Sequence, residues 1–325
     1  MARDVVVRKQ KDGVTDFISL TMCDRDFSIE AKRFGATAEE IELMKNGGVY
    51  RAAINIEEYS KSPTGYSCII YNFELHDEPA GNFIDWSEGM DEARNTIQRA
   101  LNMVGESIYR GLVFNLIMPN WDKFAVWTAA SSFHHNSLGG LMVHTAEVIE
   151  QSEQIADLWD EKYGPGFINK PLLISAALLH DLAKTKELKV DTFSGSTEYS
   201  TQAALETHIT MCVSMIDIEA YKIGFGYQIC NGSDDSSELK TEEQIKSEQE
   251  ALSLLKHCIL SHHGVKEYGS PLPPNCPEAA ILHAADNISA EMFRFNKSLK
   301  NMEPGTSQTV WQGGSMITTY KESTK

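Results

Sequence analysis

The sequence predicts an α+β protein with more than one domain, a small N-terminal β-barrel followed by an all-α domain. Residues 1 to about 80 contain five short runs rich in β-branched and aromatic residues, a pattern typical of strands. From Asp91 onward, apolar residues recur instead at the 3.6-residue spacing of helices. With 325 residues the chain is long enough for two ordinary domains.

The predicted strands are separated by turn-forming stretches such as the Asn-Gly-Gly at 46–48, and one short helix is expected over 37–45. Five strands with a helix after the third is the order of an OB barrel. OB barrels often bind single strands through aromatic side chains. The strands are expected at 5–7, 17–21, 27–29, 49–54 and 66–71. Five aromatic residues are stacking candidates, although each is more often a core residue: Phe17, Phe27, Phe34, Tyr50 and Tyr71.

The domain organisation follows from these patterns. We expect the barrel over 1–80, a linker and helix over 81–110, the all-α domain over 111–300 and a tail over 301–325. The first helix is expected to bury one apolar face, formed by Ala93, Ile97, Ala100, Leu101, Val104 and Ile108. The tail has no core of its own, so it docks either on a partner subunit, as in a homo-oligomer, or back on the barrel.

Composition indicates a cytoplasmic protein without a membrane span. Hydrophobic residues make up 42% of the chain, no apolar run approaches ~20 residues, and the N-terminus lacks the apolar region of a signal peptide. The six cysteines are scattered without a CxxC pair, which favours free thiols. A net charge of −17 argues against a broad surface that coats nucleic acid, but it is compatible with a narrow channel or a metal-lined cleft.

The stretch LLISAALLHDLAKTKE, residues 172–187, is the centre of the all-α domain. Its apolar run predicts a buried helix that ends at His180 and Asp181. Burying an imidazole and a carboxylate costs several kcal/mol unless both are satisfied. A divalent cation would satisfy both groups, whereas a hydrogen-bonded His-Asp pair in the core is the alternative for an isolated dipeptide.

Further histidines and an aspartate lie in other apolar helical segments. A lone core histidine is more often hydrogen-bonded than metal-bound. However, clustered imidazoles and carboxylates are the ligand set of catalytic Mn, Fe, Zn or Mg sites. We therefore predict a metal site built from His144, His180, Asp181, His208, one of His262 and His263, and Asp286.

The order H … HD … H … HH … D resembles the HD-domain superfamily of metal-dependent phosphohydrolases. Four blocks, HHNSLGGLMVHT, SAALLHDLAKTKEL, ILSHHGVKEYGSP and AILHAADNISAEM, are similar to the YhaM-type 3′-5′ exoribonuclease family. Proteins of that family carry an OB-fold ahead of the HD domain. The resemblance covers about 110 to 300 closely and the first 80 residues less specifically.

The resemblance implies a role for each site residue. One cation would be held by His144, His180, Asp181 and Asp286. Asp181 would bridge to a second cation, completed by His208, His262 and His263. Lys184 matches the lysine of the HDxxK pattern and would contact a substrate phosphate. His134 and His135 would lie near that phosphate, the alternative being two exposed loop histidines. The implied catalytic residues are thus Asp181, Lys184, His134 and His135.

The implied function is a metal-dependent phosphodiesterase, a 3′-5′ exonuclease acting on single-stranded RNA or DNA through a dinuclear site. Mn²⁺ is the first candidate for the two divalent cations, ahead of Fe²⁺, Co²⁺, Mg²⁺ and Zn²⁺. One alternative is an HD-type nucleotide or cyclic-nucleotide phosphohydrolase. Others are a diiron oxygenase and a nucleic-acid-binding or regulatory module with a vestigial HD site.

Overall fold

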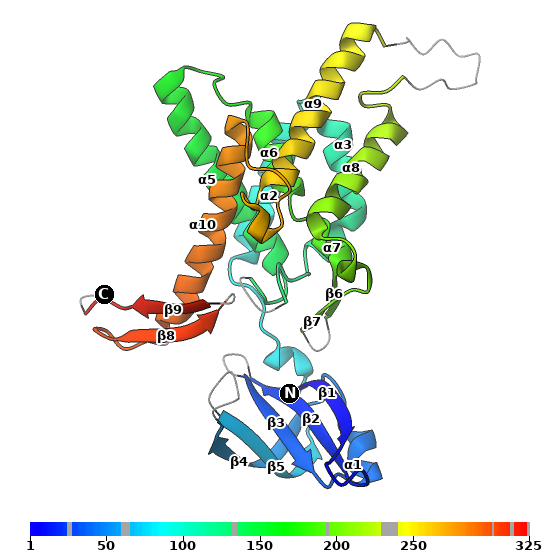
Figure 1. Cartoon of the computed structure of the whole chain (residues 1–325), viewed down its shortest axis with the longest axis vertical. Helices are drawn as coiled ribbons and strands as arrows, with labels where there is room; N and C mark the ends of the chain where they lie inside the picture. The colour runs from blue at the N-terminus through cyan, green and yellow to red at the C-terminus, as the bar shows by residue number, and fades with distance from the viewer. Residues whose placement is uncertain are drawn as a thin grey trace. The chain divides into compact units, whose positions relative to one another are not determined.

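The computed structural model describes residues 1–24, 28–59, 66–131, 135–192, 195–228, 240–300, 302–312 and 315–323. The chain separates into two compact units, each with its own hydrophobic core. The first unit comprises 1–86, 190–197 and 309–317, and the second comprises 87–189, 198–308 and 318–325. Their elements are labelled in Figure 1.

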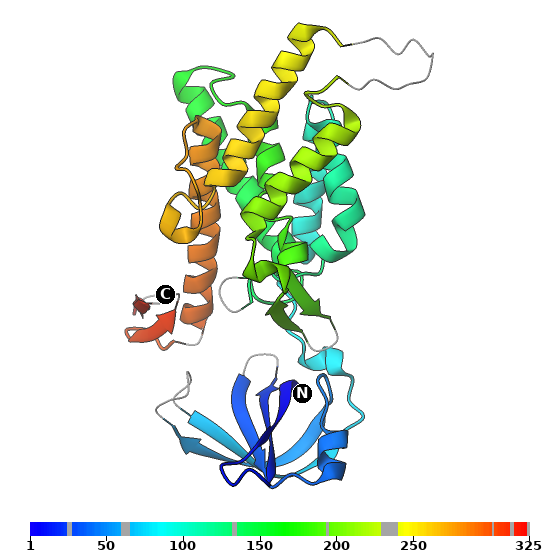
Figure 2. The same cartoon turned by 45° about the vertical axis from the view of Figure 1, so that its right-hand side comes forward.

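The first unit contains the five-stranded OB-like sheet that the sequence predicts. Its strands are β1 (Ala2–Lys9), β2 (Asp16–Cys23), β3 (Ser28–Phe34), β4 (Tyr50–Glu58) and β5 (Tyr66–Leu75). They pair in the order β1-β2-β3-β5-β4, with β3 parallel to β5 and the other pairs antiparallel. Helix α1 (Ala38–Leu43) follows the third strand as predicted and begins at a capping box made by Thr37 and Glu40. Figure 2 shows the sheet curving, with α1 at one side of it.

The aromatic residues of this sheet divide between core and surface. Tyr50 packs against the core. Phe34 and Tyr71 are instead 42% and 58% exposed, so the core expectation is wrong for these two. The reason is the two-residue period of a strand, since Cys68 and Ile70 fill the inward positions of β5 and Tyr71 therefore points outward. Phe27 lies outside the described residues.

The second unit is helical, and its central element is α6. This helix packs against α2, α3, α5, α9 and α10, and its residues 172–179 are all buried. A helix that is apolar on every face is stable only inside such a ring (Figure 1). The helices are α2 (Met90–Val104), α3 (Arg110–Ile117), α4 (Trp121–Phe124), α5 (Gly140–Tyr163), α6 (Lys170–Leu179), α7 (Lys184–Glu187), α8 (His208–Ile223), α9 (Glu242–Ser261) and α10 (Pro277–Lys300).

The first of these helices buries the predicted face except at its end. The five positions from Ala93 to Val104 are buried. Ile108 is 57% exposed, so its predicted place on this face is wrong. The helix ends at Val104, and Gly105 follows it, so the helical period no longer governs where Ile108 points.

Two hairpins were not predicted. The expectation that nearly everything from 91 to about 300 is helix or loop is confirmed, with the exception of β6 (Leu188–Asp191) and β7 (Ser196–Tyr199), whose four-residue strands are too short to show a period. The tail forms β8 (Ser307–Gln312) and β9 (Ser315–Tyr320). After β9, the ammonium of Lys321 donates to the carbonyl oxygens of Leu299 and Met302, at 3.0 and 2.6 Å, beside the end of α10.

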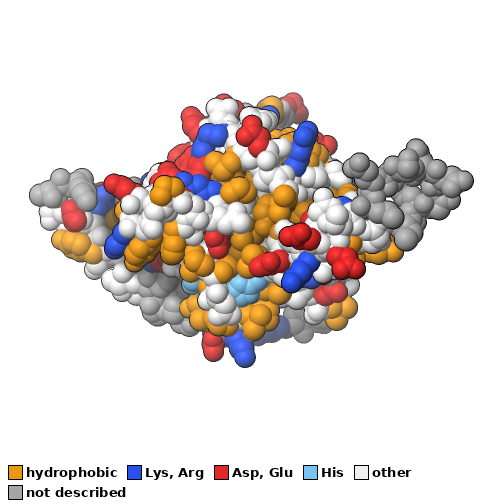
Figure 3. Space-filling view, turned by 90° about the horizontal axis from the view of Figure 1, so that it is seen from above, with side chains coloured by type: hydrophobic (Ala, Val, Ile, Leu, Met, Phe, Trp, Pro, Cys, Tyr) orange, Lys and Arg blue, Asp and Glu red, His pale blue; other side chains and the backbone are white. Residues whose placement is uncertain are grey.

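Two further features concern the length of the helices and the charges on one face of the molecule. None of the helices in the described part of the chain combines the length and the apolar character that a bilayer span requires. On the face seen from above, acidic and basic side chains are interspersed among apolar ones, and histidine reaches the surface (Figure 3). That face therefore presents no broad basic area.

Candidate metal centre

The predicted ligands lie on separate helices and meet inside the helical unit. His144 lies in the second turn of α5, and His180 is the C-cap of α6 with Asp181 directly after it. His208 begins α8, His262 is the C-cap of α9, and Asp286 lies on α10. Five of these side chains are buried, while His263 and Asp286 are half-buried. The packing of these helices thus brings the predicted imidazole and carboxylate ligands together inside the helical unit.

One group of ligands, which we name cluster A, consists of His144, His180, Asp181 and Asp286. The Nε2 atom of His144 lies 3.1 Å from Asp286 Oδ1 and 3.3 Å from His180 Nε2. Asp181 Oδ2 lies 3.4 Å from the Nε2 atoms of both histidines. The donor atoms of His144, His180 and Asp181 lie within 4.8 Å of one another, and Asp286 approaches His144 from a third helix.

The other group, cluster B, consists of His208, His262 and His263, whose donor atoms lie within 4.8 Å of one another. Asp181 also faces this cluster, but with its second oxygen. Its Oδ1 atom lies 3.5 Å from His208 Nε2 and 3.9 Å from His262 Nε2. One carboxylate thus directs Oδ2 toward cluster A and Oδ1 toward cluster B.

Three atoms at this junction fit a bound cation. Asp181 Oδ1, His208 Nε2 and His262 Nε2 are buried and have no hydrogen-bond partner among the described residues. An unsatisfied buried polar atom costs about 1–3 kcal/mol, so native proteins rarely retain three of them at one place. Coordination of a divalent cation by imidazole and carboxylate would satisfy all three.

The orientation of the imidazoles also fits the binding of a cation. In each ring the Nδ1 atom is engaged at 2.7–3.0 Å, which leaves Nε2 directed at the clusters. Carbonyl and carboxylate oxygens only accept, so the Nδ1 facing them carries the proton and Nε2 keeps its lone pair. The partners are the carbonyls of Ala177, Ile259 and Tyr268 for His180, His262 and His263, the Glu187 carboxylate for His208 and the Ser289 hydroxyl for His144.

Cluster A contains charges that compensate one another. Burial alone lowers the pKa of His144, but its contacts with Asp181 and Asp286 outweigh burial and raise that pKa to about 9. Burial alone raises the pKa of Asp181, yet the Lys184 ammonium and the nearby imidazoles hold it well below its usual range. Lys184 Nζ is buried and lies 2.7 Å from Asp181 Oδ2. The predicted contact of Lys184 with a phosphate stays a prediction.

Two imidazoles of cluster B, those of His262 and His263, are held in the neutral form by their surroundings. Burial and the adjacent His263 ring lower the pKa of His262 well below its usual value. Burial also lowers the pKa of His263. A neutral imidazole is the form that binds a metal. These two rings are therefore ready to act as ligands at neutral pH without first losing a proton.

His135 lies in the interior beside cluster A. Its Nε2 atom is 3.3 Å from Glu147 Oε2, and its ring centroid is 4.3 Å from that of Phe293. Burial lowers its pKa. The alternative of an exposed loop histidine is thus wrong for His135, whereas its predicted place near a substrate phosphate stays a prediction. His134 lies outside the described residues.

Sequence reasoning missed three residues that contact the predicted ligands or lie next to such a contact. Glu187 contacts His208, Ser289 contacts His144, and the Ser289 hydroxyl donates to Glu147 Oε2 at 2.6 Å. A usable signal was present for the two carboxylates. Glu147 follows His144 by three residues and Glu187 follows Lys184 by three residues, a spacing that places side chains on the same face of a helix.

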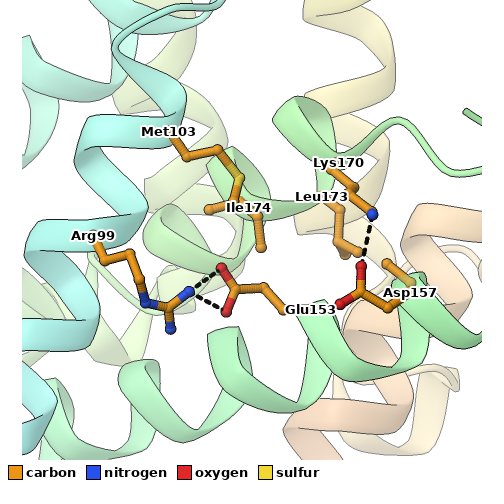
Figure 4. Close-up of a pocket in the computed structure, with 8 residues that line it drawn as sticks. Arg99, Met103, Glu153, Asp157, Lys170, Leu173 and Ile174 are labelled. Atoms are coloured by element: carbon orange, nitrogen blue, oxygen red, sulfur yellow. Dashed lines mark hydrogen bonds and ion pairs between the residues drawn. The ribbon is translucent and has the colours of Figure 1, made fainter.

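A separate pocket of about 250 Å³ lies between α2, α5 and α6 and contains none of the predicted ligands. Figure 4 shows that its charged side chains pair with each other, Arg99 with Glu153 and Lys170 with Asp157. Met103 and Ile174 form part of its apolar wall. Because its charges are already paired, this pocket offers no comparable set of donors, and the candidate site is the histidine and aspartate centre.

Comparison with known proteins agrees with this geometry. The HD domain family model matches residues 141–291, a range that contains every predicted metal ligand. Proteins described as 3′-5′ exoribonuclease YhaM are similar over most of the chain. The protein from Bacillus velezensis is 28% identical over 89% of this chain and 83% of its own length. The one from Oceanobacillus iheyensis is 26% identical, with 93% and 87% covered.

The YhaM protein from Bacillus subtilis is 31% identical over 66% of this chain and 59% of its own length. No solved structure matches the chain. The family match falls on the helical unit, where two clusters of imidazoles and carboxylates suit divalent cations. Residues 141–291 of this chain therefore match the HD domain, and the chain is similar over most of its length to proteins described as exoribonucleases of the YhaM type.

Proposed function

We propose that this chain is a two-cation 3′-5′ exonuclease that acts on single-stranded RNA and uses Mn²⁺. The observation that carries the proposal is Asp181, whose two oxygens face different ligand clusters at 3.4–3.9 Å. A carboxylate in that position is suited to bridge two cations. The names of the similar proteins support the substrate and the direction of digestion.

The residues would divide the work as follows. His144, His180, Asp181 and Asp286 would hold one cation, and Asp181 with His208, His262 and His263 would hold the other. Two bound divalent cations supply a water of lowered pKa and stabilise the charge that grows on phosphoryl oxygens. Lys184, at 2.7 Å from Asp181, would place a further positive charge beside the same oxygens.

The OB-like unit would supply the grip on the single strand. Tyr71 and Phe34 are exposed aromatic side chains on its strands, and each such ring can stack on one base. A grip that depends on stacking agrees with a chain whose net charge is −17, because it needs few phosphate contacts. Stacking is also tolerant of sequence, as a degrading enzyme requires.

The test uses the whole chain, stripped of metal and reloaded with Mn²⁺. A single-stranded RNA labelled at its 5′ end is expected to shorten progressively, and the same RNA labelled at its 3′ end is expected to release a labelled mononucleotide first. An Asp181→Asn variant is expected to do neither. DNA of the same sequence and a panel of nucleotides and cyclic nucleotides are tested in parallel. Hydrolysis of the small substrates with the RNA left intact would replace this proposal with the phosphohydrolase alternative.

A further inference from the structure

We propose that Glu187 is a positioning residue for cluster B, where it orients His208 toward the cation. The inference rests on the proposed function, because it takes His208 to be a ligand. Glu187 is the last residue of α7, and its side chain is buried. Both oxygen atoms of its carboxylate contact His208.

Glu187 holds His208 at two points. Its Oε2 atom lies 3.0 Å from His208 Nδ1, and its Oε1 atom accepts the backbone N–H of His208 at 2.9 Å. That backbone group is one of the free donors at the start of α8. Thr207, the N-cap of α8, makes no side-chain capping bond. One carboxylate therefore fixes both the ring and the backbone from which the ring projects.

The contact at Nδ1 also selects the tautomer. A carboxylate has only acceptors, so the His208 Nδ1 atom that faces it carries a hydrogen, and in the neutral ring the lone pair then lies on Nε2. Nε2 is the atom that lies 3.5 Å from Asp181 Oδ1 and has no hydrogen-bond partner among the described residues. Glu187 thus directs the free lone pair of His208 into the space between cluster B and Asp181.

In cluster A, the side chain that contacts an imidazole belongs to a different residue type, so the two clusters can be perturbed separately. His144 Nδ1 contacts the hydroxyl of Ser289 at 2.9 Å, and that hydroxyl donates to Glu147. The side chain that contacts a ligand imidazole is therefore a hydroxyl at His144 in cluster A and a carboxylate at His208 in cluster B, whereas the other three rings face backbone carbonyls. A change at Glu187 is expected to weaken the cluster B cation, and a change at Ser289 is expected to weaken the cluster A cation.

The decisive variant is Glu187→Gln. The amide has nearly the same volume, but it cannot accept from both His208 N–H groups. If its NH₂ group faces Nδ1, the ring hydrogen moves to Nε2, and the ligand atom is lost. Removal of such an outer partner typically weakens metal binding about 10–100-fold. We expect Mn²⁺ titrations to show one of the two sites weakened by that factor and the other unchanged.

The matched control is Glu278→Gln. Glu278 is also a buried carboxylate of the helical unit, and it accepts the backbone N–H of Asn169 at 2.7 Å without touching a predicted ligand. It is expected to keep both Mn²⁺ affinities. Mn²⁺ bound per chain, together with the EPR signal that separates a coupled pair from a single ion, is the measurement. Ser289→Ala provides the reciprocal case.

The site affected is identified by a double variant. In a chain that carries His208→Ala, the further change Glu187→Gln is expected to cost no additional Mn²⁺ affinity, because the group that it positions is gone. A purely structural role for Glu187 would instead give losses that add. A second measurement needs no variant of Glu187: ¹⁵N spectra of the histidine rings are expected to show His208 protonated at Nδ1. Protonation at Nε2 would overturn the inference.

A failure of the two-cation function and a failure of the proposed role of Glu187 would give different results. If the unaltered chain binds fewer than two Mn²⁺ ions, the two-cation function is wrong and the inference falls with it. If the unaltered chain binds two ions and Glu187→Gln binds both with unchanged affinity, only the role of Glu187 is refuted. Loss in Glu278→Gln equal to that in Glu187→Gln would likewise refute it.

Discussion

Clusters A and B lie on either side of Asp181, yet they differ in how their polar groups are satisfied. Cluster A contains two carboxylates, and it neutralises them within the protein through His144 and the Lys184 ammonium. Cluster B contains three imidazoles, two of which have buried Nε2 atoms without a hydrogen-bond partner among the described residues. The polar groups of cluster A therefore satisfy one another within the protein, whereas cluster B leaves two imidazole nitrogens that a cation would satisfy.

The largest effect is expected at the residue that both clusters share. Asp181→Asn should remove both cations and lower nuclease activity by more than the roughly 10²–10³-fold that loss of one electrostatic group costs. Metal content and activity are measured on the same samples. Asp157→Asn, a change at an exposed carboxylate on α5, is the control and should behave as the unaltered chain. An Asp181→Asn chain that still binds two cations would remove the basis for the bridge.

Asp181→Ala is a poorer choice for this experiment. It leaves the buried ammonium of Lys184 without its partner, and breaking a buried pair in this way costs about 3–5 kcal/mol. Urea unfolding of the two variants is expected to show this difference, with the alanine variant the less stable.

The next prediction separates the clusters. Asp286→Asn and His262→Gln should each reduce the bound cations from two to one and lower activity about 10²–10³-fold. Their effects on the metal-free chain should differ. Asp286→Asn removes a charge that His144 contacts at 3.1 Å and should destabilise the chain, whereas His262→Gln leaves the ion pairs of cluster A intact and should destabilise the chain less. Equal losses of metal-free stability would show that the clusters are alike.

Lys184→Met tests the role of the Lys184 ammonium, the positive charge that the protein itself would add to those of the cations. Activity is expected to fall about 10²-fold, because one positive charge near the phosphoryl oxygens is lost. Both cations should remain, since Lys184 donates no ligand atom. Lys186→Met, an exposed position on the same short helix, is the control. Loss of a cation in Lys184→Met would mean that the ammonium organises cluster A and does not serve the substrate.

Metal removal should change the stability of the fold only modestly, and its effect on the backbone should be local. A cation present at about 100 times its Kd stabilises the folded chain by about 2.7 kcal/mol, and a chelator removes that contribution. Hydrogen exchange should then accelerate most at the start of α8 and the end of α9, which carry His208 and His262. The second turn of α5, with His144, should change less. Faster exchange in α5 than in α8 would reverse the comparison.

The fold and the ligands differ in how far local sequence predicts them. The strands and α1 follow from short alternating runs and turn residues, and the burial of 172–179 follows from an apolar run that no surface helix could carry. The exposure of Ile108 was not predicted, because this residue lies past the end of a helix. The β6–β7 hairpin was not predicted either, because its strands have only four residues. Local patterns report burial well only where an element is long.

The sequence by itself determined which donors the centre has: imidazoles and carboxylates in apolar helices, in the order that runs from His144 to Asp286. Only the tertiary structure decided that Asp181 turns one oxygen to each cluster, that Glu187 holds His208 and that His135 is buried beside Glu147. The physical reason is that a residue type fixes what an atom can bind. The direction in which that atom points depends on how helices distant in the sequence pack together.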